Sequence, residues 1–519
     1  MLRYSLLWRV SGVILCRAGG NCPLAAWEQF LNRLSWGSRQ ASLAAIALAI
    51  ILAGVFLLYA PTLSDPFHGD DFVAFTEFMT KSFFDYSRDV FLFKDTNFYW
   101  RPLGSIFHYA LYAGFGLDPF VYHFAALLFF LATLVCLYLF CLGENLGKLT
   151  ALGSALIFGI YSNHVVSVSW VTNTSRVASG LFVMVCLLLI QRARTSRRAF
   201  LWETAALLAF TVAALNDETT TALAPVPFLY GTFLARRSLH LRGAAARLIV
   251  YGALVAVIVP LQFTYTIDDE ARLTQYGLGP HVLTSVWVLA SQLTLPLASG
   301  SPVAVMIQLV GPAQWAAGLV ILFASALAFL SGSRPVKFLV VWIGLAFAPF
   351  ALWEPQDISP RYVYLAAMPF AILASWSCVR LISCLRASIP GHQWPSRALR
   401  LGVPAAALAV SAAVAFLSIN ADKERNAAWS KETAKYGVLR TALEDEFPAM
   451  LPGTRLIVLY GEWPDFWASS VARTVFGDPS LWVTSIPRER VDQAEIRTQP
   501  NDILVYMLGD RLMSVNTRR

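Results

Sequence analysis

The stretch VYHFAALLFFLATLVCLYLFCL, residues 121–142, contains no Asp, Glu, Lys or Arg. A helix of this length spans about 30 Å of hydrocarbon, and its backbone groups bond one another, so none is left unpaired in lipid. The stretch therefore predicts a transmembrane helix.

The composition of the whole chain agrees with this stretch. Of 519 residues, 57% are hydrophobic and 14% are charged, a balance that requires many segments buried in lipid. The formal net charge of +8 does not indicate a nucleic-acid partner, because the basic residues lie in short loops between apolar runs, where they orient membrane helices. We expect an all-α polytopic membrane protein with the lipid bilayer as its partner and no nucleic acid.

Eleven apolar runs are long enough, or nearly long enough, to cross the bilayer. They cover residues 42–60, 121–142, 149–163, 176–191, 200–216, 221–235, 245–264, 311–331, 338–353, 362–384 and 401–419. A further apolar stretch, 281–310, is broken by two prolines and a glycine, and counting it as one crossing would place Arg334 and Lys337 outside. A re-entrant pair or two short spans keep these charges inside. The sequence therefore predicts an odd number of transmembrane helices within the range 11 to 13, that is, 11 or 13.

Three regions with different characters follow one another along the chain. Segment 1–41 carries five arginines and one acid, so the positive-inside rule places it in the cytoplasm. Region 42–419 is the predicted transmembrane domain and includes the first external loop, 61–120. Residues 420–519 form a small external α/β domain, because RLIVLY (455–460) and DILVYML (502–508) predict strands around a helix near 467–476.

Two adjacent acids, Asp70 and Asp71, follow the first apolar run in SDPFHGDDFVAF, residues 64–75. One interpretation is structural: the acids begin and cap a helix within an acidic, translocated loop. The other is functional, because a carboxylate just outside the hydrocarbon can act on a group at headgroup depth. The residues around the pair leave both interpretations open.

Four segments in order resemble one family. The acidic pair is followed by YWRPLG (99–104) and FGLDPFVYHFAALL (115–128), then by ALNDETTTALAPVPFLY (214–230) and ISPRYVYLAAMPF (358–370). With these motifs in this order, the chain resembles the membrane-embedded GT-C glycosyltransferases, especially bacterial relatives of the protein O-mannosyltransferase and TMTC type. The resemblance implies a GT-C-like fold in a bacterial inner membrane, with the C-terminal domain in the periplasm.

The chain departs from the family pattern at three points. Asp217 stands where the Lys of an SKE pattern is expected, and Pro360 stands where an acid precedes RYLY. No tetratricopeptide array follows the membrane part. The family roles of that lysine and that acid therefore have no counterpart here, and the acceptor stays open.

The resemblance implies transfer of a sugar from a polyprenyl-phosphate donor to a hydroxyl of a protein, lipid or glycan at the periplasmic face. The leaving phosphate is a stable anion, so one carboxylate that takes the acceptor's proton is the main remaining requirement. By resemblance, Asp70 is the expected base. Asp71 is expected to orient it, bind the acceptor or share a divalent metal ion with it.

The metal requirement is not decided by the sequence. Two neighbouring carboxylates raise each other's pKa unless a cation or hydrogen-bond donors compensate. The Asp70 and Asp71 pair is therefore either tuned toward basicity or neutralised by a divalent metal. No other cofactor is indicated.

Five further residues are candidates for substrate binding: Arg101, His123, Glu218, Arg361 and Tyr362. A guanidinium holds a phosphate through paired hydrogen bonds, so the two arginines are expected to bind the donor phosphate. The structural alternative is that they reach toward lipid headgroups. The histidine and the glutamate lie at predicted span ends, where an ionisable group is either functional or a satisfied structural residue.

Two other functions fit a polytopic chain. A polysaccharide polymerase or ligase would also use polyprenyl-linked substrates, but its main external loop is expected late in the chain. A transporter or flippase of lipid-linked sugars would place ionisable residues within spans near the midplane. Because the acids here cluster at external boundaries, glycosyl transfer is favoured.

Overall fold

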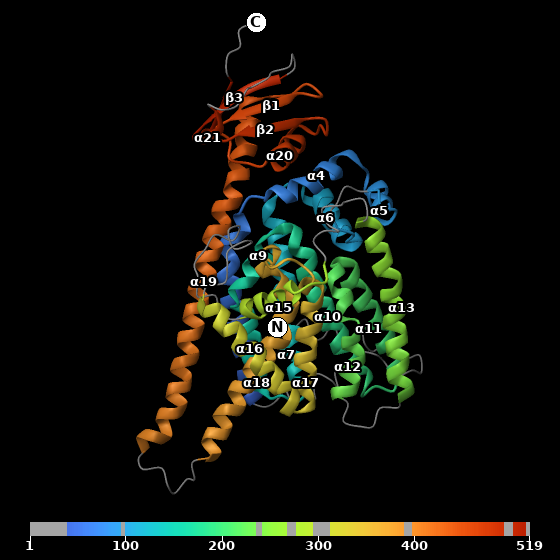
Figure 1. Cartoon of the computed structure of the whole chain (residues 1–519), viewed down its shortest axis with the longest axis vertical. Coiled ribbons are helices and arrows are strands. Elements are labelled where there is room, and N and C mark those ends of the chain that lie inside the picture. The colour runs from blue at the N-terminus through green and yellow to red at the C-terminus, as the bar shows by residue number, and fades with distance from the viewer. Residues whose placement is uncertain are drawn as a thin grey trace, which may run out of the picture. The chain divides into compact units, whose positions relative to one another are not determined.

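The computed structural model describes residues 39–94, 99–234, 241–266, 277–293, 312–388, 397–491 and 502–514. These residues are mostly helical, with one small sheet near the C-terminus (Figure 1). The predicted cytoplasmic segment 1–41, apart from its last three residues, lies outside the described residues. Most of the predicted break at 281–310 also lies outside them.

The helices before the C-terminal domain follow the apolar pattern of the sequence. They are α3 (Arg39–Tyr59), α4 (Gly69–Thr80), α5 (Phe83–Phe91), α6 (Pro102–Phe115), α7 (Pro119–Gly143), α8 (Lys148–Gly159), α9 (Val165–Ser169), α10 (Thr174–Ala193), α11 (Ala199–Asn216), α12 (Pro225–Leu234), α13 (Leu241–Thr266), α15 (His281–Gln292), α16 (Pro312–Ser331), α17 (Arg334–Ala351), α18 (Tyr364–Ser388) and α19 (Arg397–Glu446). Short 3-10 turns join several of them: η1 (Ala60–Ser64), η2 (Ser162–His164), η3 (Val171–Asn173), η4 (Glu218–Leu223), η6 (Pro355–Asp357) and η7 (Pro360–Val363).

Each of the eleven predicted apolar runs overlaps a helix. Within the described part of the chain, six helical segments are long and apolar enough to cross a membrane: Ser42–Ser64, Pro119–Gly143, Val171–Ala193, Ala199–Asn216, Arg334–Ala351 and Pro360–Cys384. A seventh is reached if Lys148–Gly159 and Ser162–Ser169, bent by 49°, form one span. Two other apolar helices, Ala246–Gln262 and Trp315–Ser331, are shorter. The predicted membrane-protein class is confirmed, whereas the predicted 11 to 13 spans are not.

Large apolar side chains on several of these helices face outward. Leu57, Leu208, Phe323 and Leu381 are between 61% and 69% exposed. Such surfaces are unfavourable in water but suit contact with hydrocarbon. The outer surface of the helices therefore fits a lipid environment.

The C-terminal domain contains a four-stranded sheet in the order β2-β1-β3-β4. Its strands are β1 (Arg455–Leu459), β2 (Trp482–Ile486), β3 (Asp502–Leu508) and β4 (Arg511–Ser514). β1 is parallel to both neighbours, with Arg455 opposite Trp482 and Asp502, and β3 and β4 are antiparallel. Helix α20 (Asp465–Phe476) connects β1 to β2, because parallel strands need a crossover. The predicted two strands and helix are confirmed, and β2, β4 and the four-residue helix α21 (Arg488–Val491) are additional.

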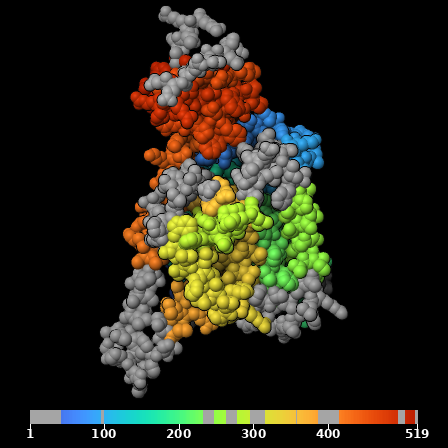
Figure 2. Space-filling model, viewed as in Figure 1, coloured from blue at the N-terminus to red at the C-terminus, as the bar shows by residue number. Residues whose placement is uncertain are grey.

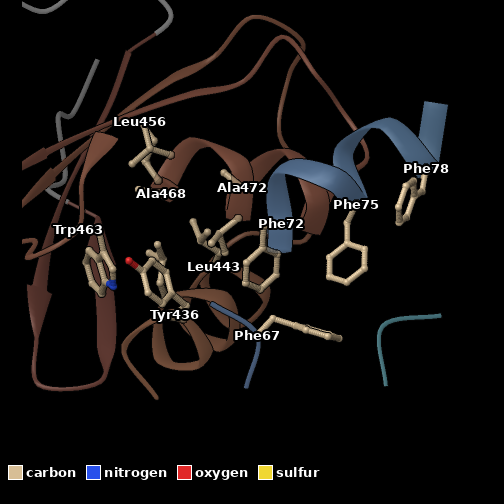
Figure 3. Close-up of a cluster of buried hydrophobic side chains, with 14 of the residues drawn as sticks. Phe67, Phe72, Phe75, Phe78, Tyr436, Leu443, Leu456, Trp463, Ala468 and Ala472 are labelled. Atoms are coloured by element: carbon tan, nitrogen blue, oxygen red, sulfur yellow. The ribbon is translucent and has the colours of Figure 1, made fainter. Parts of the chain in front are cut away.

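One apolar cluster joins the first loop to the C-terminal domain. Helix α4 contributes three phenylalanines, and α19, α20 and the sheet contribute their partners (Figure 3): Phe72, Phe75, Phe78, Tyr436, Leu443, Leu456, Ala468 and Ala472. The surface of the C-terminal domain adjoins that of the first loop (Figure 2). Because helix α4 is short, this packing rather than its own hydrogen bonds determines where it lies.

Truncation of Phe75 tests this cluster. Its ring is 1% exposed and lies 4.7 Å from the Phe67 ring and 5.6 Å from the Tyr122 ring, centroid to centroid. We predict that Phe75→Ala lowers the free energy of unfolding by about 3–5 kcal/mol, because it leaves a cavity in a packed core. Thermal unfolding in lipid, followed by tryptophan fluorescence, measures the change.

The matched control is Phe84→Ala, because Phe84 is 83% exposed. Its midpoint should stay within about one degree or two of the parent, as expected for a surface change. Equal shifts for the two variants would show that the cluster does not hold α4 in place.

Candidate active site

A cavity of about 120 Å³ lies where α4, α6, α10, η4 and η7 approach one another. Five of the seven predicted site residues line it: Asp70, Arg101, Glu218, Arg361 and Tyr362. Asp71 and His123 are not among the described residues that line it. The structure therefore brings together a carboxylate and two arginines that are far apart in the sequence.

The span ends around the cavity are those that the charge rule predicts to be external. Arg176 lies near the start of α10, Glu218 just follows α11, Phe350 lies near the end of α17, and Arg361 just precedes α18. The cavity therefore lies at one end of these apolar helices.

Helix α4 places Asp70 and Asp71 differently. His68 caps the helix: its Nδ1 accepts a hydrogen bond from the Asp70 backbone N–H at 3.4 Å. The Asp71 carboxylate accepts one from the His68 backbone N–H at 2.9 Å, which completes a capping box. Asp71 therefore supports the His68 cap as the second member of the capping box, whereas Asp70 lines the cavity.

Asp71 also fastens α4 to η3. It is buried, and its Oδ1 accepts hydrogen bonds from the backbone N–H of Thr172 at 2.9 Å and from the Thr172 hydroxyl. Burial raises the pKa of Asp71 to about 7, and the bonds from Thr172 and His68 limit the rise. A role for Asp71 beside the base stays a prediction.

The geometry of the pair bears on the predicted metal. Asp71 directs both carboxylate oxygens to protein donors, and the Asp70 Oδ1 accepts a hydrogen bond from Trp467. Within the described ranges, no group of three or more His, Cys, Asp or Glu side chains is arranged to hold a metal ion. The two acids therefore do not present two free carboxylates to a shared ion.

Asp70 is partly buried at the cavity wall. Its Oδ1 accepts a hydrogen bond of 2.6 Å from the indole Nε1–H of Trp467. Burial raises the pKa of Asp70 above its usual range, while the Trp467 donor and the Arg361 charge oppose the rise. A carboxylate in this setting is a better proton acceptor than one in water.

Arg101 and Glu218 form a two-pronged ion pair. Arg101 donates from Nε and Nη2 to the two Glu218 oxygens at 2.6 and 2.7 Å, and the guanidinium lies 4.7 Å from the Tyr99 ring centroid. Burial opposes the charge on Arg101, but Glu218 outweighs this effect and holds the Arg101 pKa above its usual range. The charge of Arg101 is therefore already compensated by the Glu218 carboxylate.

Arg361 is held by aromatic rings instead. Its guanidinium carbon lies 4.5 Å from the Trp170 ring centroid and 5.2 Å from that of Tyr362. Its Nη2 donates to the Tyr362 hydroxyl at 3.2 Å. No described carboxylate lies within 4 Å of Arg361, so its remaining donors are available to an anion in the cavity.

Arg176 also lines the cavity, and the sequence analysis did not identify it. It is buried, and its Nε donates to the Asp217 Oδ2 at 2.6 Å. Burial would raise the pKa of Asp217, but Arg176 and then Arg101 hold it below its usual range. The acid that departs from the family pattern is therefore the counter-charge of a buried arginine. The signal in the sequence that could have identified Arg176 is its position in an apolar run, where an ionisable residue is a candidate for function.

His123 lies near the start of α7, away from the cavity lining. It is buried, and its Nε2 is 3.1 Å from the Asp65 carbonyl oxygen. This contact ties α7 to the chain that follows η1. This position fits the alternative that His123 is a satisfied structural residue. Substrate binding by His123 stays a prediction.

The Arg176 and Asp217 pair gives a stability prediction. Asp217→Asn removes the counter-charge of a buried guanidinium, which should cost about 3–5 kcal/mol of unfolding free energy. Thermal unfolding in lipid measures it. The control is Asp85→Asn, because Asp85 pairs with Arg88 at an exposed site and should lose at most about 1 kcal/mol. An Asp217→Asn protein as stable as the control would contradict the assignment.

Comparisons with known proteins were made by sequence and by structure. No family model matches the sequence, and no curated protein sequence matches it. The oligosaccharyltransferase of Archaeoglobus fulgidus in the apo form is similar in structure, with a TM-score of 0.51 and 14% identity over 87% of this chain and 65% of that chain. The same protein tethered with an acceptor peptide containing the NVT sequon gives a TM-score of 0.50, 13% identity and the same coverage.

ArnT from Cupriavidus metallidurans bound to undecaprenyl phosphate gives a TM-score of 0.47 and 12% identity over 88% of this chain and 92% of that chain. This chain spans 65% of the length of the archaeal chain. At identities this low, structural similarity establishes the fold and not the activity. The chain therefore shares the fold of the archaeal oligosaccharyltransferase over 87% of its length.

Proposed function

We propose that the protein is a membrane glycosyltransferase that moves a sugar from a polyprenyl-phosphate donor to a hydroxyl acceptor. The observation that carries this proposal is the cavity at the membrane boundary, which Asp70, Arg101 and Arg361 line together. The GT-C fold supports it. The acceptor is a hydroxyl of a protein, lipid or glycan.

The donor phosphate is assigned first to Arg361. This arginine has no described carboxylate partner within 4 Å, and the rings of Trp170 and Tyr362 hold it in place. Arg101 is a second ligand whose pair with Glu218 keeps it oriented before the phosphate arrives. Guanidinium groups suit this task because they stay charged in an apolar setting.

The reaction needs one proton acceptor. The acceptor hydroxyl attacks C1 of the sugar and gives its proton to the Asp70 carboxylate, while the bond from C1 to the phosphate oxygen breaks. The electron pair of that bond goes to the phosphate oxygen. The leaving group is polyprenyl phosphate, which remains bound to the arginines after the bond breaks. Asp71 maintains the position of Asp70 through the helix cap, and Glu218, Tyr362 and His123 complete the proposed binding residues.

The membrane arrangement is proposed from the charge rule. Segment 1–41 lies on the cytoplasmic side of a bacterial inner membrane. Region 42–419 crosses this membrane 11 to 13 times, and residues 420–519 lie in the periplasm. The transfer takes place at the periplasmic face. By the resemblance of its motifs, we assign the protein to the bacterial relatives of the protein O-mannosyltransferase and TMTC type.

Asp70→Asn is the direct test. Removal of a general base should lower kcat/KM by roughly 10²–10⁴-fold, with a parent-like melting temperature. Purified protein in lipid receives a panel of radiolabelled hexoses linked to undecaprenyl phosphate, with membranes of the source cells as acceptor. Release of undecaprenyl phosphate and label in the acceptor are measured.

The control for this test is Asp85→Asn, an exposed carboxylate in the same loop, which should keep the parent's rate. If Asp70→Asn also keeps the parent's rate, Asp70 is not the base. If intact donor crosses sealed vesicles without release of undecaprenyl phosphate, the protein is a transporter.

The pH profile follows from the environment of Asp70. Because burial raises its pKa, and the carboxylate form is the active one, kcat/KM should rise with pH through a midpoint above the ordinary Asp value of about 3.9. A rate that is constant from pH 4 upward would contradict the assignment of Asp70.

Arg361→Lys tests the phosphate ligand. Lysine keeps the charge but loses the paired donors, so kcat/KM should fall by roughly 10- to 100-fold. Arg380→Lys is the control, because Arg380 lies exposed on α18. Parent-like kinetics in Arg361→Lys would remove Arg361 from the donor site.

A further inference from the structure

Among the described residues of the C-terminal domain, Trp467 is the one that donates a hydrogen bond to the Asp70 carboxylate. It lies on α20, 397 residues from Asp70 in the sequence, and its indole Nε1 donates to the Asp70 Oδ1 at 2.6 Å. An indole N–H is a donor only. The bond therefore favours the ionised carboxylate and specifies which of its two oxygens is engaged.

The position of Trp467 is determined by close packing. A Cβ atom added at Gly69 would lie 2.5 Å from the Trp467 Cγ, so only glycine fits beneath the indole. The His68 ring lies 5.0 Å from the Trp467 ring and the Tyr436 ring lies 6.0 Å from it, both edge-on. The side chain is thus enclosed by α4 and α19 as well as by its own helix.

The helix that carries Trp467 is fastened to α4 by more than this side chain. The Thr474 hydroxyl on α20 donates to the Phe72 carbonyl oxygen at 3.2 Å. Buried Ala468 and Ala472 of α20 belong to the same apolar cluster as Phe72 and Phe75. The donor to Asp70 is therefore presented by a helix that is packed and hydrogen-bonded against α4.

We propose that the C-terminal domain completes the active site: Trp467 is a positioning residue that holds the Asp70 carboxylate by Oδ1 and leaves Oδ2 to take the acceptor's proton. This inference rests on the proposed function, because it assigns a purpose to the same carboxylate. It gives the C-terminal domain a role in catalysis.

In the part of the chain that the structure describes, four groups besides Trp467 act on Asp70 or face it. Asp71 and His68 lie beside it on the α4 side, Arg361 lies on η7, and Tyr436 lies on α19. Burial lowers the pKa of His68 to about 3, so this ring stays neutral in the working range. Burial also raises the pKa of Asp71, to about 7, and the neighbouring Asp70 charge adds to this rise, so the acid limb of the pH profile belongs to the pair.

Trp467→Phe keeps an aromatic ring and removes the donor. Because the lost hydrogen bond stabilised the carboxylate, the acid limb of kcat/KM should move upward by about one pH unit. The loss is then about 10-fold below the midpoint and shrinks as pH rises. A uniform loss at every pH, with the limb unchanged, would indicate structural damage and overturn the proposal.

Two matched variants sharpen the test. Trp463→Phe removes an indole that donates to the Lys435 carbonyl oxygen in the same domain, and its acid limb should not move. Gly69→Ala should displace the Trp467 indole and reproduce the shift, whereas Gly114→Ala, with no atom within 4 Å of the added Cβ, should not. A Gly69→Ala protein with the parent's limb would contradict the packing argument.

A spectroscopic readout tests the contact without the reaction. In full-length protein labelled with ¹⁵N at the tryptophan indoles, the Trp467 resonance is assigned by its absence in Trp467→Phe. It should shift with pH through a midpoint above about 3.9, and the shift should vanish in Asp70→Asn. If the pH-dependent shift of the Trp467 resonance is unchanged in Asp70→Asn, the inference is overturned.

The two readouts separate the possible failures. If no donor in the panel is consumed but the Trp467 resonance titrates with Asp70, the proposed function fails and the contact stands. If Asp70→Asn abolishes transfer while Trp467→Phe keeps the parent's acid limb, the function stands and the role of Trp467 fails.

Discussion

Compensation of buried charge at the membrane boundary determines how the cavity is built. The Arg176 and Asp217 pair joins α10 to the end of α11, and the Arg101 and Glu218 pair joins the start of α6 to η4. A buried guanidinium without its carboxylate is strongly destabilising, so these pairs specify which helix ends meet. Among the described arginines that line the cavity, Arg361 is the one without a carboxylate partner within 4 Å, so its donors can turn to an incoming anion.

A second constraint acts on the carboxylate side. Helix α4 has little stability of its own, and the packing of its phenylalanines against the C-terminal domain fixes its position. The capping box at His68 and Asp71 then decides the direction of Asp70. The membrane helices supply the cationic part of the site, and the loop with the C-terminal domain supplies the oriented carboxylate.

Much of this could be predicted from the sequence, because lipid imposes a simple rule on helices and each predicted apolar run overlaps a helix. The motifs also identified five candidate residues that line one cavity in the structure: Asp70, Arg101, Glu218, Arg361 and Tyr362. What escaped prediction depends on contacts between distant segments. The partner of Arg176 lies 41 residues away, and Trp467 reaches Asp70 across 397 residues. Hydropathy could not separate complete spans from the bent helices and the shorter ones.

The proposed reaction requires a lipid-borne phosphate to bind in this cavity. An electron cryo-microscopy structure of the full chain in lipid nanodiscs, with undecaprenyl phosphate added, would show where it binds. We expect density for the phosphate within hydrogen-bonding distance of the Arg361 guanidinium, on the side of the cavity that Asp70 faces. A phosphate bound outside the cavity, with Arg361 and Asp70 both turned away from it, would rule out this binding site.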